Sequence, residues 1–214
     1  MANFQSAIGR GAIVTVMNAK VYTPDSTKVK GWSAKSPSEI ITELETETTP
    51  GTSPAIAVID HLKFANLTMS GPDITITGGR YANTLVKFGK SLRCEMQAAL
   101  CDKDALVALG GASYDGADKS LTITDKFPGP VSIVGDTFIV DQASGEQIPV
   151  KIVIYQFLPD AIVSLTQDEA TAATFDLNGD VLSVEIEGNG GSCSNTISAF
   201  YSIVDDCDSD ESGD

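Results

Sequence analysis

The sequence predicts a mainly β fold, a β-sandwich or β-barrel flanked by one α-helix and carrying a long loop or arm. Short runs rich in Val, Ile and Thr recur between Gly, Pro, Asn and Asp residues along most of the chain. Two such runs form a clear hairpin pattern, and one segment alone has a helical composition. With 214 residues, 42% of them hydrophobic, the chain can enclose one sizeable core, so we expect a single domain over residues 1–204.

The strand pattern is met by ten segments, each rich in β-branched residues and bounded by turn formers. The strongest hairpin is TFIVDQASGEQIPVKIVI, where Ser144-Gly145 lies in a polar loop between two β-branched arms and the glycine can adopt a positive φ. The predicted strands are residues 12–17, 55–60, 73–77, 84–88, 120–124, 131–141, 148–157, 161–166, 181–187 and 197–204.

Residues 23–54 depart from this pattern, with four prolines and many Ser, Thr and Glu residues. SPSE at 36–39 fits a capping box with Pro37 at the first helical position, whereas ITELETET alternates like a strand. A loop of this length is usually functional or disordered. We therefore expect a flexible arm or an extended hairpin that contacts a neighbouring subunit. The residues assigned to that contact are Ser36, Pro37, Glu39, Ile40, Ile41 and Leu44.

The segment SLRCEMQAALCDKDALVALGG predicts one substantial helix over about residues 91–109, because it is rich in helix formers and ends at two glycines. The expected packing face consists of Leu92, Met96, Ala99 and Leu100. The side chains expected to face water or a neighbouring subunit are Arg93, Glu95, Gln97 and Lys103.

Two cysteines, Cys94 and Cys101, lie within this predicted helix. Seven residues of helix separate them by about 10.5 Å along the axis, which is too far for a disulfide. We expect both to be small buried hydrophobic residues rather than a redox or metal pair.

The chain is strongly acidic, with 14 Lys and Arg against 29 Asp and Glu and a net charge of -15. This composition argues against a nucleic-acid-binding protein, because binding to phosphates depends on clustered Lys and Arg. The end of the chain, residues 205–214, predicts a disordered acidic tail. Its alternating aspartates resemble a calcium loop, but Glu211 stands where an EF-hand needs glycine. No apolar run approaches the roughly 18 residues of a membrane helix, so we expect no membrane association.

Signs of catalytic chemistry are few. The single histidine, His61, follows a predicted strand and is expected to be a strand-end residue, while Cys193 and Cys207 lie in a predicted loop and in the tail. GKS at 89–91 lacks the preceding glycine and spacer of a phosphate loop. We expect no enzyme, and we assign no catalytic, cofactor-binding or metal-binding residue.

The order of segments between about residues 83 and 188 is more specific than any single motif. The helix GKSLRCEMQAALCDKDALVALGGA is followed by KFPGP, GDTF, the hairpin turned at SGE, the LPD step before VSLT, and TFDLNGDVLSV. In this order the chain resembles the tail tube (major tail) proteins of long-tailed bacteriophages and related prophage particles. Residues 23–54 and the acidic tail have no counterpart in that pattern.

The resemblance implies a structural virion protein that self-assembles into hexameric rings stacked as a hollow tube, through which DNA passes without specific binding. It implies that the helix lies outside a continuous barrel of neighbouring sheets, and that the tape-measure protein and the tail terminator or baseplate proteins are partners. The protein would be assembled in the host cytoplasm and located in the virion tail. An acidic subunit suits such a tube, because fixed cations would slow DNA.

Two alternatives stay open from the sequence. One is a tail terminator or baseplate-proximal ring protein of similar fold. The other, from a different class, is a ligand- or calcium-binding β-sandwich module, although the aromatic content of 7% forms no cluster typical of a sugar platform.

Overall fold

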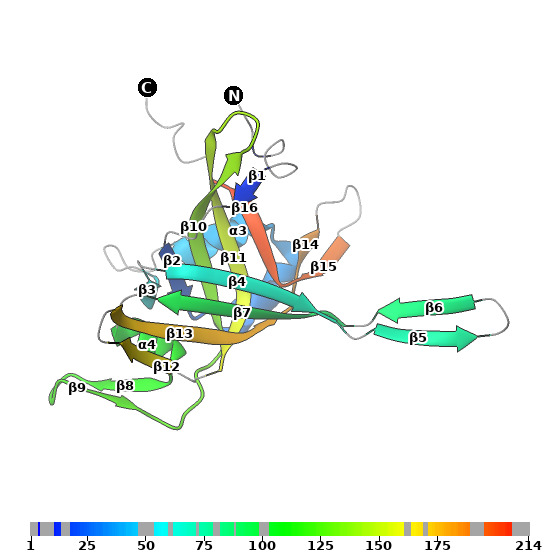
Figure 1. Cartoon of the computed structure of the whole chain (residues 1–214). Helices are drawn as coiled ribbons and strands as arrows, with labels where there is room; N and C mark the ends of the chain where they lie inside the picture. Colours follow the sequence, from blue (N-terminus) through cyan, green and yellow to red (C-terminus); the bar gives the residue numbers. More distant parts are fainter. Residues whose placement is uncertain are drawn as a thin grey trace.

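The computed structural model describes residues 4, 11–13, 18–46, 54–59, 62–71, 73–78, 82–87, 89–98, 103–160, 164–168, 171–188 and 195–206 (Figure 1). The helical elements are α2 (Ser26–Gly31), η1 (Trp32–Ala34), α3 (Pro37–Glu45) and α4 (Lys103–Leu109). The strands are β1 (Gly11–Ile13), β2 (Asn18–Tyr22), β3 (Ala57–Ile59), β4 (Leu62–Ser70), β5 (Asp73–Gly78), β6 (Ala82–Lys87), β7 (Ser91–Ala98), β8 (Ala112–Asp115), β9 (Ser120–Ile123), β10 (Val131–Asp141), β11 (Gln147–Pro159), β12 (Ser164–Asp168), β13 (Thr171–Leu182), β14 (Val184–Gly188), β15 (Asn195–Ala199) and β16 (Tyr201–Asp205).

The centre of the fold is a ten-stranded antiparallel sheet (Figure 1). Its main path runs β3-β2-β10-β11-β13-β7-β4, while β1, β12 and β16 pair with β10, β13 and β11. The other described strands form the two-stranded ribbons β5–β6, β8–β9 and β14–β15. The predicted mainly β fold class with a small helical component is therefore confirmed.

The large sheet curls back on itself. Strands β3 and β4 stand at opposite ends of its path, yet only residues 60 and 61 separate them in the chain. Three Cα–Cα steps span at most about 11 Å, so Ile59 and Leu62 must lie near each other. The two ends of the sheet consequently approach at this corner, and one buried cluster joins residues of β2, β3, β7 and β10, so the sheet is strongly curled.

An inner core fills the concave side of this sheet. Leu92, Cys94 and Met96 enter it from β7, and Ala105 and Leu109 of α4 join them. Its other buried members are Ala19, Val21, Ala57, Ile59, Val131, Ile133, Ile154, Phe157, Leu177 and Val181.

An outer core lies on the opposite face of β2, β10 and β11, beneath residues 26–45, which we call the strap. Neighbouring residues alternate between the cores, since Ile133 and Ile154 lie in the inner core and Val134 and Val153 in the outer core. Both faces of β10 and β11 are thus covered, which explains why apolar residues occupy neighbouring positions such as 133–134 and 152–155. The remaining buried members of the outer core are Tyr22, Trp32, Ile40, Ile41, Leu44, Tyr155, Val184 and Ile186.

A β-bulge in β11 redirects its side chains. The register pairs Val131 with Phe157 but Ile133 with Ile154, so β11 contains one extra residue in this interval. As a result Tyr155 packs in the outer core and Phe157 in the inner core. Gly179 of β13 allows β13 to approach β11 closely beside the Phe157 ring, because a Cβ at this position would lie only 2.7 Å from that ring.

The predicted helix over 91–109 is wrong in its first half. Residues 91–98 form strand β7, and the helix α4 covers only Lys103–Leu109. Leu92 and Met96 are buried as expected, but on the inner face of a strand. Their two-residue spacing with Cys94 follows the strand period, and burial of that face outweighs the helical propensity of Met, Gln and Ala. Ala99, Leu100 and Cys101 lie outside the described residues.

The segment 23–54 is neither an open arm nor a hairpin over its described part. The capping-box interpretation of SPSE is confirmed, because the Ser36 hydroxyl accepts from the Glu39 backbone N–H and the Glu39 carboxylate accepts from the Ser36 N–H, with Pro37 in the first turn. The alternative interpretation of ITELETET as a strand is wrong over its described residues, because a helix places Ile40, Ile41 and Leu44 together on the outer core.

A first prediction concerns the inner core. Met96, 2% exposed, becomes an unpaired buried carboxylate in Met96→Asp, and we expect a loss of about 3 kcal/mol or more in the free energy of unfolding. Urea denaturation followed by circular dichroism measures this loss. Glu95→Gln on the outward face of the same strand is the matched control, expected to change stability by less than about 0.5 kcal/mol. Equal losses for the two variants would contradict the assigned orientation of β7.

Candidate assembly surfaces

Four strands form the side of the body that the strap leaves uncovered, and we call this side the wall. Its order is β12–β13–β7–β4, with β13 paired to β12 and β7, and β4 paired to β7. Within the described part of the chain, β12 has no further partner beyond β13 and β4 has none beyond β7. Among the described residues the wall therefore has two edges without a further strand partner, and the N–H and C=O groups of such edges can pair with another chain.

The outward face of the wall is polar where its side chains are described on β7 and on residues 176–180 of β13. Arg93, Glu95 and Gln97 alternate on β7 with the buried inner-core residues and are half-buried. Gln97 Nε2 donates to Asp176 Oδ1 at 2.8 Å across the register pair that joins β7 and β13. Asp180 stands opposite Arg93 on the same strand pair.

Arg93 is the centre of an ion-pair cluster on this face. Its Nη2 lies 2.5 Å from Asp160 Oδ2, and its Nη1 lies 3.5 Å from Asp180 Oδ1. The hydrogen bond to Asp160, followed by the charges of the surrounding carboxylates, raises the pKa of Arg93. Glu95, Asp160, Asp176 and Asp180 together carry four negative charges against the one positive charge of Arg93, so this cluster has a net charge of -3.

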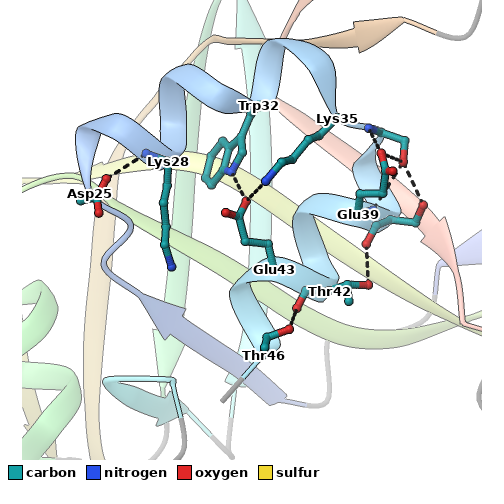
Figure 2. Close-up of polar contacts among 10 residues, drawn as sticks. Asp25, Lys28, Trp32, Lys35, Glu39, Thr42, Glu43 and Thr46 are labelled. Atoms are coloured by element: carbon teal, nitrogen blue, oxygen red, sulfur yellow. Dashed lines mark hydrogen bonds and ion pairs between the residues drawn. The ribbon is translucent and has the colours of Figure 1, made fainter. Parts of the chain in front are cut away.

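The strap is organised by polar contacts within and between its short helices (Figure 2). Asp25 caps α2 by accepting from the Thr27 and Lys28 backbone N–H groups, both at 2.8 Å. Glu43 accepts from Trp32 Nε1 at 3.0 Å and lies 2.8 Å from Lys35 Nζ. The hydrogen bond from Lys35 is the main cause of the lowered pKa of Glu43. These contacts tie η1 to α3.

Glu45 joins the end of the strap to the sheet. Lys151 Nζ of β11 lies 2.9 Å from Glu45 Oε2, and Lys20 Nζ of β2 lies 3.2 Å from Glu45 Oε1. Burial would raise the pKa of Glu45, but the hydrogen bond and charge of Lys151 and the charge of Lys20 outweigh it, so the pKa lies below its ordinary value. Lys151 also lies 3.4 Å from Asp206, which connects the chain beyond β16 to the same cluster.

All six residues assigned to a subunit contact have a role inside the chain. Ser36, Pro37 and Glu39 begin α3, and the apolar three are buried in the outer core. Contact of residues 36–54 with a neighbouring subunit stays a prediction, which within α3 concerns the exposed side, while residues 47–53 lie outside the described residues. Sequence reasoning missed the wall, although Arg93, Glu95 and Gln97 were expected to face outward. The alternation of polar and apolar residues over 91–97 was the signal that could have revealed it.

Chemistry-bearing groups do not converge in the described residues. Cys94 is fully buried, and burial, aided by the charge of Glu95, raises the pKa of its thiol to about 12. Such a thiol is a packing residue, as expected, because the thiolate is the reactive form. No group of three metal-ligating side chains occurs among the residues that the structure places. His61, Cys193 and Cys207 lie outside the described residues.

None of the helices that the structure describes has the length and apolar character needed to cross a membrane.

A second prediction concerns Glu45. Its lowered folded-state pKa means that its stabilisation is present above the ordinary value of 4.5 and is lost as the pH falls through the folded-state value. We expect Glu45→Gln to lower the free energy of unfolding by about 1 kcal/mol at pH 7 and by much less at pH 3. Urea unfolding of both proteins at the two pH values measures the difference. Glu185→Gln at an exposed position of β14 is the control, and a loss for Glu45→Gln that is equal at both pH values would argue against the assigned ion pairs.

Comparisons with known proteins bear on one part of the chain. A search of curated proteins finds no match. The model of the YomU/Tube protein family matches residues 113–196, which run from β8 into β15 and include β10, β11, β12 and β13. The matched segment contains the central hairpin and half of the wall. This match points to a phage tail tube protein family, in agreement with the resemblance found in the order of sequence segments.

Proposed function

We propose that the chain is a structural subunit of a phage tail tube, assembled as hexameric rings that stack into a hollow conduit for DNA. The observation that carries the proposal is the wall, whose two edge strands have no further partner within the described part of the chain and whose outward side chains on β7 and on residues 176–180 of β13 form an acidic polar cluster. The family match over residues 113–196 supports the same structural role.

The free edges supply the ring contact in this proposal. The edge of β4 in one copy pairs with the edge of β12 in the next, so that the walls of successive copies become one continuous sheet. Such a contact joins two different surfaces and is therefore heterologous, and it closes into a ring when the rotation between copies divides a full turn. Pairing of this kind also removes edges that would otherwise promote aggregation.

The polar face then lines the lumen. The strap covers β2, β10 and β11, whereas three pairings along the sheet, through β11 and β13, separate β7 of the wall from β10. A lumenal wall implies that the strap faces the outside of the tube. The net charge of -3 on the outward cluster keeps phosphates at a distance, since phosphate binding requires cations.

The remaining assignments follow from a tube subunit. Its partners would be the tape-measure protein and the tail terminator or baseplate proteins. The protein would be assembled in the host cytoplasm and remain in the virion tail. The work of the chain would be structural rather than enzymatic.

A third prediction tests the assembly itself. The purified full chain should form rings or tubes at high concentration, because each copy carries both halves of the edge contact. Negative-stain electron microscopy and sedimentation velocity detect these species. A chain that stays monomeric at every concentration and in the presence of tail partners would overturn the proposed function.

A fourth prediction tests the lumenal face. Glu95→Lys combined with Asp180→Lys changes the charge of the cluster from -3 to +1, and tubes of this variant should retain DNA in a salt-dependent manner and deliver it about tenfold less efficiently. The matched control is Glu185→Lys with Glu187→Lys, which makes the same charge change on exposed positions of β14. Filter binding with DNA at two salt concentrations and phage titre are the readouts. Equal DNA retention by the two variants would show that the wall does not face the lumen.

A further inference from the structure

The β8–β9 ribbon is amphipathic, and its apolar face is open. In the register, Ala112 pairs with Ile123 and Tyr114 with Leu121, so these four side chains share one face. The opposite face carries the pairs Ser113 with Thr122 and Asp115 with Ser120. The ribbon stands apart from the large sheet at the lower left of Figure 1.

Three residues of the apolar face are exposed: Tyr114 by 43%, Leu121 by 39% and Ile123 by 58%. Two-stranded ribbons are at best marginally stable in water when no hydrophobic face is covered. Contiguous exposed apolar side chains mark interaction surfaces rather than ordinary solvent-facing strands. The apolar face of the ribbon is therefore a candidate surface for contact with another protein chain.

The base of the ribbon is held in place. Thr124 Oγ1 donates to the Gly111 carbonyl at 2.6 Å. Gly111 has φ of +65°, and a Cβ there would lie 2.3 Å from the Lys126 carbonyl oxygen, so the two arms meet at a point only glycine can occupy. Lys103 Nζ lies 4.7 Å from the centre of the Tyr114 ring. These contacts fix the direction of the ribbon relative to α4, which lowers the ordering cost of binding.

Apolar surface continues past the ribbon onto the body. Phe127 is 81% exposed, and Val107 of α4 is 40% exposed. Val107 and Pro128 line both of two adjoining shallow grooves. The larger groove, about 420 Å³ in volume, also includes Ile56 and Val131. A partner that covers the ribbon can thus also seat side chains beside α4.

We infer that this surface, which we call the ribbon patch, is a docking site for a second copy of the same chain, separate from the pairing of β4 with β12. The inference rests on the proposed function, in which every copy meets others within the tube. The ribbon also lies almost entirely inside the segment that matches the tube family, residues 113–196.

The distribution of charge favours contact between two copies of the chain at the ribbon patch. The chain carries -15, so two copies repel over most of their surfaces. Residues 103–130 contain three Lys and four Asp, a net charge of -1, which leaves -14 on the other 186 residues. The apolar face of the ribbon bears no ionisable group except the Tyr114 phenol. Contact there combines apolar burial with little repulsion.

The test compares charges placed on the two faces of the same strand. Ile123→Asp adds a carboxylate to the apolar face, and Thr122→Asp adds it to the polar face one residue away. Both positions are exposed in the single chain, so both variants should fold like the wild type by circular dichroism. We expect Ile123→Asp to raise the concentration for half assembly by about tenfold or more, with little change for Thr122→Asp. Sedimentation velocity and negative-stain microscopy of the full chain measure this.

Hydrogen exchange gives an independent readout, because residues 112–124 should exchange more slowly in wild-type assemblies than in the monomer. Assembly of the wild type and Thr122→Asp, impaired in Ile123→Asp and with slowed exchange in the ribbon, supports the inference. If all three proteins assemble alike, or if both variants are impaired equally, the ribbon patch is not the contact, while the proposed tube function stands. A wild type that never assembles overturns both.

Discussion

The structure depends on the two-sided burial of the β10–β11 hairpin. Inner-core residues such as Ile133 and Ile154 alternate with outer-core residues such as Val134 and Val153. Both faces of these strands therefore carry apolar side chains that must be covered by other parts of the chain. The curl of the sheet covers one face, and the strap with the β14–β15 ribbon covers the other. Strand β7 and the described part of β13 need no second layer over their outer side, because outward residues such as Arg93, Glu95 and Asp180 are polar. The division between a covered side and an open side therefore originates in the alternation of side chains along the strands.

Much of this arrangement was predictable from local sequence. The strand over 131–141, the turn at Gly145 with φ of +71°, and the capping box at SPSE follow from β-branched content, turn chemistry and spacing. The error over 91–98 arose because Met, Gln and Ala favour a helix, while the burial that selects a strand comes from distant partners in β4 and β13.

Long-range pairings set the limit of prediction for the assembly surfaces. Glu45 and Lys151 are 106 residues apart, and no spacing rule connects them. The acidic character of the chain was clear from composition, but only the register of β7 against β13 brings Arg93, Gln97, Asp176 and Asp180 onto one face. The amphipathic nature of the β8–β9 ribbon likewise appears only once Tyr114 is paired with Leu121.

The position of Trp32 has a practical consequence. It is the single tryptophan of the chain, and it is fully buried in the outer core. The centroid of its ring lies 6.1 Å from the centroid of the Tyr155 ring. Its fluorescence therefore reports whether the strap is packed against the sheet, whereas far-ultraviolet circular dichroism reports the strand content of the whole chain. Comparing the two signals separates local release of the strap from global unfolding, without any label being introduced.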